Sequence, residues 1–223
     1  MNPLTVLHDS LYFFRRNLTS IIMLCLPLVV LEALTKQAVG NALAANASQI
    51  YELLIGLLFY PLYTGALILF LDSRSRSEQP RKRDLMAMAL RMWPMFAVLS
   101  ALSTLLIMFG LSMFIVPGIW VMVKLAFSEY LLVLRGMTPL AAMRESVKMT
   151  KGHFLRILVC VLCVYIPLSV LEGVSLYILP DPLSMPVSLL IDSLSSFLQL
   201  FTSVVIFRLF MLITDPPEKS LVV

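Results

Sequence analysis

Residues 27–32 read Pro-Leu-Val-Val-Leu-Glu, and residues 167–172 read Pro-Leu-Ser-Val-Leu-Glu. Each copy lies within an apolar stretch that is long enough to cross a bilayer, which takes about 20 mostly apolar residues in a helix. Because a charged side chain deep in lipid costs about 2.5–3.5 kcal/mol, acids are rare in such stretches. The repeated Glu therefore indicates either a duplicated structural joint or a polar site within a membrane protein.

The composition of the whole chain indicates the same class. Among its 223 residues, 60% are hydrophobic and 13% are charged, and the mean hydropathy is +0.93. Such values are typical of integral membrane proteins. The bilayer criterion predicts crossings at about 18–38, 50–71, 95–116, 119–134, 156–179 and 187–213. We therefore expect an all-α, polytopic bundle of six transmembrane helices that forms a single domain over residues 1–223, with Pro117-Gly118 as a type II turn between the third and fourth.

The basic residues lie on one side of the predicted crossings. All Lys and Arg residues except Lys36 and Lys124 lie near the chain ends or near the second and fourth connections between crossings. Since Lys and Arg accumulate on the cytoplasmic side, we expect both termini in the cytoplasm. The net charge of +4 then reflects this orientation and an attraction to membrane lipids, and no nucleic-acid partner is expected.

The first apolar stretch also has the three-part pattern of a signal peptide. Two arginines precede it, and the small residues Ala42-Leu43-Ala44 follow it. Glu32 and Lys36 interrupt that pattern, however. The likeness of this stretch to 156–179, which lies too far along the chain to be a signal, favours a retained helix.

A duplication extends outward from the repeated motif. At an offset of 140, five of the eight residues from Pro27 to Leu34 match those from Pro167 to Val174. In addition, segments 4–14, 83–92 and 138–152 each precede a crossing and carry apolar residues on one side and charges nearby, as interfacial amphipathic helices do. Each of them would begin a repeat unit of one cytoplasmic surface helix and one transmembrane hairpin. The predicted units are 1–71, 83–134 and 138–213.

The third surface segment is the best defined. Thr138 is a candidate N-cap, Pro139 suits the first helical position, and Gly152 suits the end. Its interfacial basic residues are Arg144, Lys148 and Lys151. We expect this helix to lie on the cytoplasmic surface of the membrane.

The depth of the charged residues predicts a polar recess that opens outward. A rise of about 1.5 Å per residue places Glu32 and Glu172 about 21 and 24 Å into the membrane. This is the outer half of a hydrocarbon core about 30 Å thick. The candidate recess residues in that half are Glu32, Lys36, Glu52, Lys124, Glu172 and Asp192.

Two interpretations of the recess remain open. In the first, Glu32 pairs with Lys36 at i,i+4 and the other groups make ordinary polar contacts. In the second, the recess binds a lipid head group, a cation or a small solute. The candidate helix breaks are Pro27, Pro167, Pro117 and Gly118. A break at Pro27 or Pro167 would free a backbone carbonyl beside the recess.

Glu129 is the acid nearest the middle of the membrane in this count. It is either a proton relay or a neutral carboxyl that is hydrogen-bonded to a neighbour. No Gly-rich phosphate loop, metalloprotease motif or nucleophile elbow is present in the sequence. Cys160-x-x-Cys163 lacks the further ligands that zinc needs. We therefore expect no catalytic residues, no metal and no cofactor.

Four stretches in the second half of the chain carry a resemblance to a known family. They are Ile-Val-Pro-Gly-Ile-Trp at 115–120, Phe127-Ser128, Arg135-Gly136-Met137-Thr138-Pro139-Leu140, and the segment from Glu145 to Phe154. The chain resembles the YciC-type family of uncharacterised bacterial inner-membrane proteins, and more distantly the membrane domain of some glycerophosphodiester phosphodiesterases. The resemblance implies the bacterial inner membrane and an envelope or lipid-related role, without catalytic residues to carry over.

These observations lead to one expectation and one alternative. We expect a non-catalytic inner-membrane protein of envelope maintenance that binds or moves a lipid or small solute through the outward-facing recess. The alternative is a membrane scaffold that recruits a partner through the surface helices at 83–92 and 138–152. Membrane lipids are the partners that the sequence itself predicts.

Overall fold

A computed structural model describes residues 3–42, 45–76, 78, 80–178 and 185–214 of the chain. In these residues the regular elements are all α-helices. They are α1 Pro3–Ala42, α2 Ala45–Ser75, α3 Lys82–Met113, α4 Ile115–Leu125, α5 Ser128–Arg135, α6 Pro139–Met149, α7 Phe154–Ile178 and α8 Met185–Thr214. The predicted all-α fold class is confirmed.

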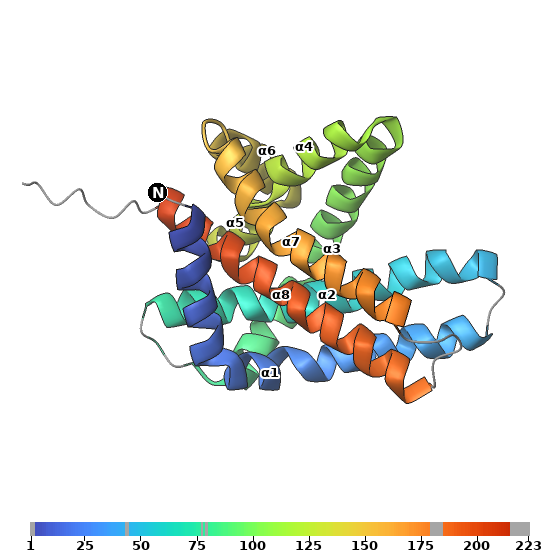
Figure 1. The fold of residues 1–223 in the computed structure, drawn as a ribbon. Coiled ribbons are helices and arrows are strands. Elements are labelled where there is room, and N and C mark those ends of the chain that lie inside the picture. The colour runs from blue at the N-terminus through green and yellow to red at the C-terminus, as the bar shows by residue number, and fades with distance from the viewer. Residues whose placement is uncertain (1–2, 43–44, 77, 79, 179–184, 215–223) are drawn as a thin grey trace, which may run out of the picture.

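The helices are those of a multi-pass membrane protein. Within the described residues, five helical spans are long and apolar enough to cross a membrane. A sixth span results if α6 and the first part of α7 count as one bent unit. In the bundle, α1 packs against α2 and α8, α2 packs against α3, and α7 packs against α8 (Figure 1).

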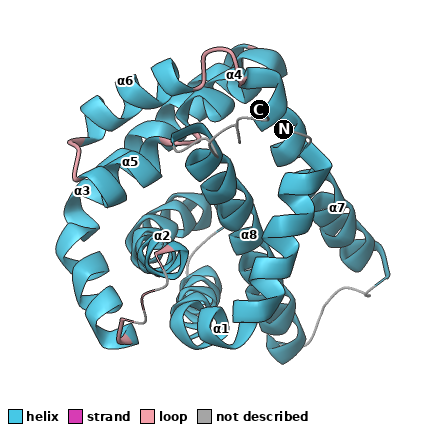
Figure 2. Ribbon diagram, turned by 90° about the vertical axis from the view of Figure 1, so that its left-hand side faces the viewer, coloured by secondary structure: helices cyan, strands magenta, loops and turns pink. Residues whose placement is uncertain are grey.

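The segments that carry the basic residues meet at one end of the bundle, here called the basic end. It comprises the start of α1, the α2–α3 connection, the start of α7 and the end of α8. Arg208 near the end of α8 places Nη2 3.3 Å from Oδ2 of Asp9 near the start of α1. A hollow beside this pair is also lined by Arg74 near the end of α2, and another joins Val6 of α1 to His153 before α7. Figure 2 views the molecule from the side where α1 begins and α2 ends.

The predicted surface helices differ in how they join their crossings. α1 contains both 4–14 and 18–38 in one helix, and α3 likewise continues from its predicted surface segment into a crossing. By contrast, α6 begins after Thr138 as predicted, and α7 turns away from it by 105°. Gly152 in the connection has a φ of +83°, a left-handed conformation that glycine adopts without a steric penalty. Glycine therefore permits the sharp turn between α6 and α7.

The turn between α3 and α4 lies at Phe114, so the prediction of a turn at Pro117-Gly118 is wrong. Phe114 is extended, and its N–H donates to the carbonyl of Gly110 at 3.1 Å. Pro117 fits in the first turn of α4 because the N–H that it lacks would have no intrahelical acceptor there. Gly110 lets the two backbones touch, since a Cβ there would lie only 2.9 Å from the Cα of Gly118.

The crossing predicted at 119–134 is interrupted, because α4 ends at Leu125 and α5 begins at Ser128. Ser146 of α6 bridges the interruption. Its hydroxyl donates to the carbonyl of Lys124 at 2.7 Å and accepts from the N–H of Phe127 at 3.1 Å. Since unpaired backbone groups are costly in apolar surroundings, this one hydroxyl stabilises the break. The surface helix α6 thereby fixes where α5 begins.

Candidate functional site

Glu32 and Lys36 form an ion pair within α1. The Lys36 Nζ lies 2.6 Å from the Glu32 Oε1, and the two side chains are 37% and 8% exposed. Glu32 faces α2, where a Cβ on Gly56 would lie 3.8 Å from the same oxygen. The other oxygen, Oε2, is buried and has no hydrogen-bond partner among the described residues. The structure therefore contains the i,i+4 pair of Glu32 with Lys36, as in the first of the two interpretations.

The other predicted recess residues do not join this pair in the described part of the chain. Glu52 is exposed on α2. The side chains of Glu172 and Asp192 lie outside the described residues. Their helices, α7 and α8, are described only as backbone at these positions.

Lys124 does not lie beside Glu32 but near the start of α7. Its Nζ lies 5.8 Å from the ring centres of Trp120 and Phe154, and Phe154 is the first residue of α7 at the basic end. The prediction that Lys124 shares the outer half with Glu32 is wrong. Because the α3–α4 turn lies at Phe114, Lys124 belongs to the last turn of α4 rather than to its outer part.

The prediction that Pro27, Pro167, Pro117 and Gly118 break their helices is also wrong. Pro27 lies inside α1 and Pro167 lies inside α7, and both helices continue past them. Each proline removes one N–H from the helix ladder, which a membrane helix tolerates when the freed carbonyl is satisfied by its surroundings. Pro117 and Gly118 are likewise helical, within α4.

A cavity of about 300 Å³, lined by apolar and polar side chains, lies where α2, α3, α4, α5, α7 and α8 meet. Its polar lining residues are Tyr60, Tyr63, Ser103, Ser128, Glu129, Tyr130, Tyr165, Ser196, Gln199, Thr202 and Ser203. Tyr60 stands midway along α2, and Gln199 stands midway along α8. The cavity is thus in the middle of the long helices, at the depth that the sequence predicts for Glu129.

Glu129 is the acid of this cavity. The Tyr60 hydroxyl donates to its carboxylate, at 2.9 Å from Oε1 and 3.2 Å from Oε2. Glu129 lies in the first turn of α5, where the unpaired N–H groups of a helix favour negative charge. The break that Ser146 stabilises therefore has a consequence for the site, because it begins a new helix just before this carboxylate.

Tyr63 connects the cavity to the Glu32 pair. It lies one turn after Tyr60 on α2, and the two rings meet edge to face with centroids 5.7 Å apart. Tyr63 is close enough to both Glu32 and Glu129 to interact electrostatically with each. One face of α2 therefore presents two tyrosines between the two buried acids.

Two hydroxyls that line the cavity have no hydrogen-bond partner among the described residues. They are Ser103 Oγ on α3 and Thr202 Oγ1 on α8, and both atoms are buried. By contrast, the nearby Tyr130 hydroxyl is satisfied, since it donates to the carbonyl of Ser203 at 2.7 Å. Burying a hydroxyl without a partner costs about 1–3 kcal/mol in proteins. A polar occupant of the cavity would satisfy both groups.

The charge of the cavity favours donors and cations. Glu129 is acidic, and none of the described residues that line the cavity is Lys, Arg or His. Carboxylate and hydroxyl oxygens accept hydrogen bonds, and tyrosine rings also attract cations over their faces. No group of three or more potential metal ligands occurs among the described residues. The arrangement is therefore suited to a polar organic ligand that carries an amine.

Sequence reasoning singled out Glu129 by its isolation but missed the residues around it. Tyr60, Ser103 and Thr202 lie on three different helices, and each is an ordinary residue in an apolar segment. The interfacial residues Arg144, Lys148 and Lys151 are exposed, as expected for a surface helix.

No family model, curated protein or solved structure matches the chain.

Proposed function

We propose that this protein is a multi-pass protein of the bacterial inner membrane that binds an amine-bearing small solute or lipid head group in the Glu129 cavity, without catalysis. The observation that carries the proposal is an acid within the bundle, Glu129, held by a tyrosine donor beside two hydroxyls that have no hydrogen-bond partner in the described part of the chain. Acids within membrane helices commonly mark ligand or ion pathways. This site replaces the outward recess as the candidate for lipid or solute handling.

The proposed orientation places the basic end in the cytoplasm. The start of α1 and the ends of α2 and α8 meet there, around a hollow of about 520 Å³ whose lining includes Arg74 and Arg208. Positive residues accumulate on the cytoplasmic side of membrane proteins. The resemblance to the YciC-type family supports the same membrane and a role in envelope maintenance.

The size and chemistry of the cavity support a small ligand. Its volume of about 300 Å³ is at the lower end of the range for ligand pockets. The Glu129 carboxylate would bind the amine, and Ser103 and Thr202 would accept from or donate to the remaining polar groups. The support for a non-catalytic role is that the hydrogen-bond partner of Glu129 is a tyrosine, Tyr60, rather than a second acid or a nucleophile–base pair.

Amine binding by the whole protein tests the proposal. Wild type, Glu129→Gln and Glu32→Gln would be placed in phosphatidylglycerol nanodiscs, and binding of radiolabelled ethanolamine, choline and glycerol would be measured by equilibrium dialysis against empty nanodiscs. We expect both amines to bind wild type more tightly than glycerol. Glu129→Gln should lower ethanolamine affinity about 10-fold or more, because the ammonium N–H donates to the carboxylate and a hydrogen bond to a charged group contributes about 1.5–3 kcal/mol.

Glu32→Gln is the matched control, since it removes one buried carboxylate of the same bundle that belongs to an ion pair instead of the cavity. It should leave amine affinity unchanged. Equal amine binding by wild type and Glu129→Gln would contradict the proposal, and so would a loss confined to Glu32→Gln.

A scaffold is the second candidate function, and the outward face of α6 favours it. Leu140 is 60% exposed and Arg144 is also exposed, whereas Ala142 and Ser146 face the bundle. A photo-crosslinker at Leu140 in intact cells would capture a protein partner if α6 recruits one. A crosslinker at the exposed Val159 of α7 is the control for a face that meets lipid. Capture of lipid at both positions would contradict the scaffold.

A further inference from the structure

Two hollows flank Tyr12 at the basic end. The first, of about 520 Å³, lies between α1, α2 and α8 and includes Arg74 and Arg208. The second, of about 550 Å³, lies along α1 and includes Arg15 and Arg16. Tyr12 lines both hollows and is 63% exposed. Four arginines from three helices thus surround one exposed tyrosine.

The basic residues of these hollows are only partly neutralised. Arg208 pairs with Asp9 at 3.3 Å, but the two side chains are 47% and 43% exposed, so the pair is weak. The Arg74 guanidinium lies over the Phe70 ring at 5.6 Å, and no hydrogen bond or ion pair joins it to the described residues. Arg15 and Arg16 likewise make no ion pair within the described part of the chain.

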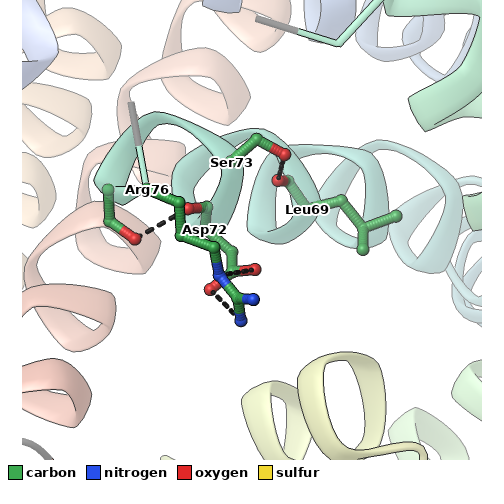
Figure 3. A network of polar contacts seen from close by, with 5 residues as sticks. Leu69, Asp72, Ser73 and Arg76 are labelled. Carbon is green, nitrogen blue, oxygen red and sulfur yellow. Dashed lines mark hydrogen bonds and ion pairs between the residues drawn. The ribbon is translucent and has the colours of Figure 1, made fainter. Parts of the chain in front are cut away.

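The neighbouring end of α2 shows how an arginine is neutralised when the fold provides an acid. Arg76 places Nε 3.2 Å from Oδ2 of Asp72, one turn earlier on the same helix (Figure 3). Ser73 and Leu69 close a second local hydrogen bond there, at 2.8 Å. Arg74, on a different side of α2, makes no ion pair within the described part of the chain and lines the hollow together with Asp9 and Arg208.

The walls of the first hollow combine this charge with apolar surface. Phe13 of α1, Leu71 of α2 and Phe207 and Met211 of α8 line it together with the two arginines. A soluble anion would need only the charged part. An amphiphile uses both, because its phosphate binds guanidinium groups while its glycerol and first chain carbons contact the aromatic rings.

We propose that the hollows around Tyr12 bind the phosphodiester head group of an anionic phospholipid. Basic pockets between helices at the membrane surface are suited to such head groups. Arg74 and Arg208 bind the phosphate from α2 and α8, and Arg15 and Arg16 extend the positive surface along α1. This site is separate from the Glu129 cavity and does not depend on the proposed function.

Native mass spectrometry of the whole protein in a neutral detergent tests this site, because a neutral micelle offers no anionic surface to the other basic residues. Phosphatidylglycerol, phosphatidylcholine and inorganic phosphate are the probes. We expect wild type to retain phosphatidylglycerol in preference to phosphatidylcholine. Arg74→Gln with Arg208→Gln should lower phosphatidylglycerol affinity about 10-fold or more.

The matched control removes the same charge elsewhere: Arg144→Gln with Lys148→Gln on α6 should change the affinity less than about 2-fold, the scale of ordinary surface substitutions. Arg15→Gln with Arg16→Gln keeps the test valid if the first variant fails to fold, since both side chains are exposed. Asp9→Asn should raise the affinity, because it removes the acid that competes for Arg208. A merely disruptive substitution would lower it.

Equal retention of the two lipids by wild type would overturn the proposal. So would an equal loss in the α6 control and in the hollow variants. Displacement of phosphatidylglycerol by millimolar inorganic phosphate would also overturn it, because the site would then bind a soluble anion rather than a lipid.

Discussion

Glu32 and Glu129 are both acids inside the helical bundle, but their neighbours give them different roles. Glu32 is paired by Lys36 from its own helix, one turn away, at 2.6 Å. Glu129 is bound by Tyr60 from another helix and faces a cavity of about 300 Å³. The Glu32 carboxyl is held by a cation on its own helix, whereas the Glu129 carboxyl is oriented by a hydroxyl from another helix and also faces the cavity.

The largest effect is expected from separating the helices that position Glu129. In Gly110→Val, the new side chain meets the backbone of Gly118 and Pro117, where even a Cβ would lie 2.9–3.2 Å from their atoms. Because backbone yields less readily than a side chain, we expect destabilisation of about 3 kcal/mol, the upper end for overpacked sites. Thermal unfolding in detergent measures it. Gly40→Val, where no atom of the described residues lies within 4 Å of the new Cβ, is the control. A stable Gly110→Val would show that the α3–α4 contact does not hold the Glu129 region.

Next in size is Tyr60→Phe, which leaves the Glu129 carboxylate without its donor. The expected loss is about 1–3 kcal/mol in the free energy of unfolding, since a buried acceptor loses its partner. Amine affinity should fall as well, because Tyr60 orients the Glu129 carboxylate. Tyr165→Phe removes a hydroxyl that lines the same cavity but is not hydrogen-bonded to Glu129 among the described residues, so it should have little effect on stability. Similar losses in the two variants would mean that Tyr60 is not the residue that orients Glu129.

Lys36→Met should have a smaller effect, about 1 kcal/mol, because the Lys36 side chain is 37% exposed and ion pairs near a surface contribute little. It should not alter amine binding, which distinguishes Glu32 from Glu129. A double-mutant cycle with Glu32→Gln measures the coupling. If Lys36→Met abolished amine binding, the two acids would form one site and the distinction between them would fail.

The smallest effect is expected at Glu52, an acid that the sequence grouped with Glu32 but that is exposed on α2. Glu52→Gln should change the free energy of unfolding by less than about 0.5 kcal/mol, as surface substitutions usually do. It should leave amine binding intact. A clear loss of binding in Glu52→Gln would return Glu52 to the ligand site and weaken the contrast with Glu129.

The fold was predictable where the sequence signal is local. Apolar length predicted the helical membrane class, and the Thr138-Pro139 start with Gly152 after the end predicted α6. The α3–α4 turn was not predictable from Pro117-Gly118, because Pro and Gly also suit the first turn of a helix and a close helix contact. The choice between these uses depends on Gly110, eight positions away in the other helix.

The site was predictable only in part. Glu129 stood out as an acid in an apolar segment, and Glu32 stood out because the motif is repeated. The repeat favoured Glu32, yet the cavity belongs to Glu129, since its lining comes from side chains on separate helices. Lys124 was misplaced because its depth was counted from the wrong turn, and its contact with Phe154 depends on how α4 meets α7.

By itself, the sequence determined the membrane class and predicted the clustering of basic residues on one side, and it offered the pairing of Glu32 with Lys36 as one of two interpretations. These features depend on composition or on residues one helical turn apart, so local physics is enough to fix them. The tertiary structure alone decided that Ser146 bridges the α4–α5 break, that Tyr60 binds Glu129, and that Tyr12 lies between two basic hollows. Each of these features depends on residues from different helices, and only helix packing brings those residues together.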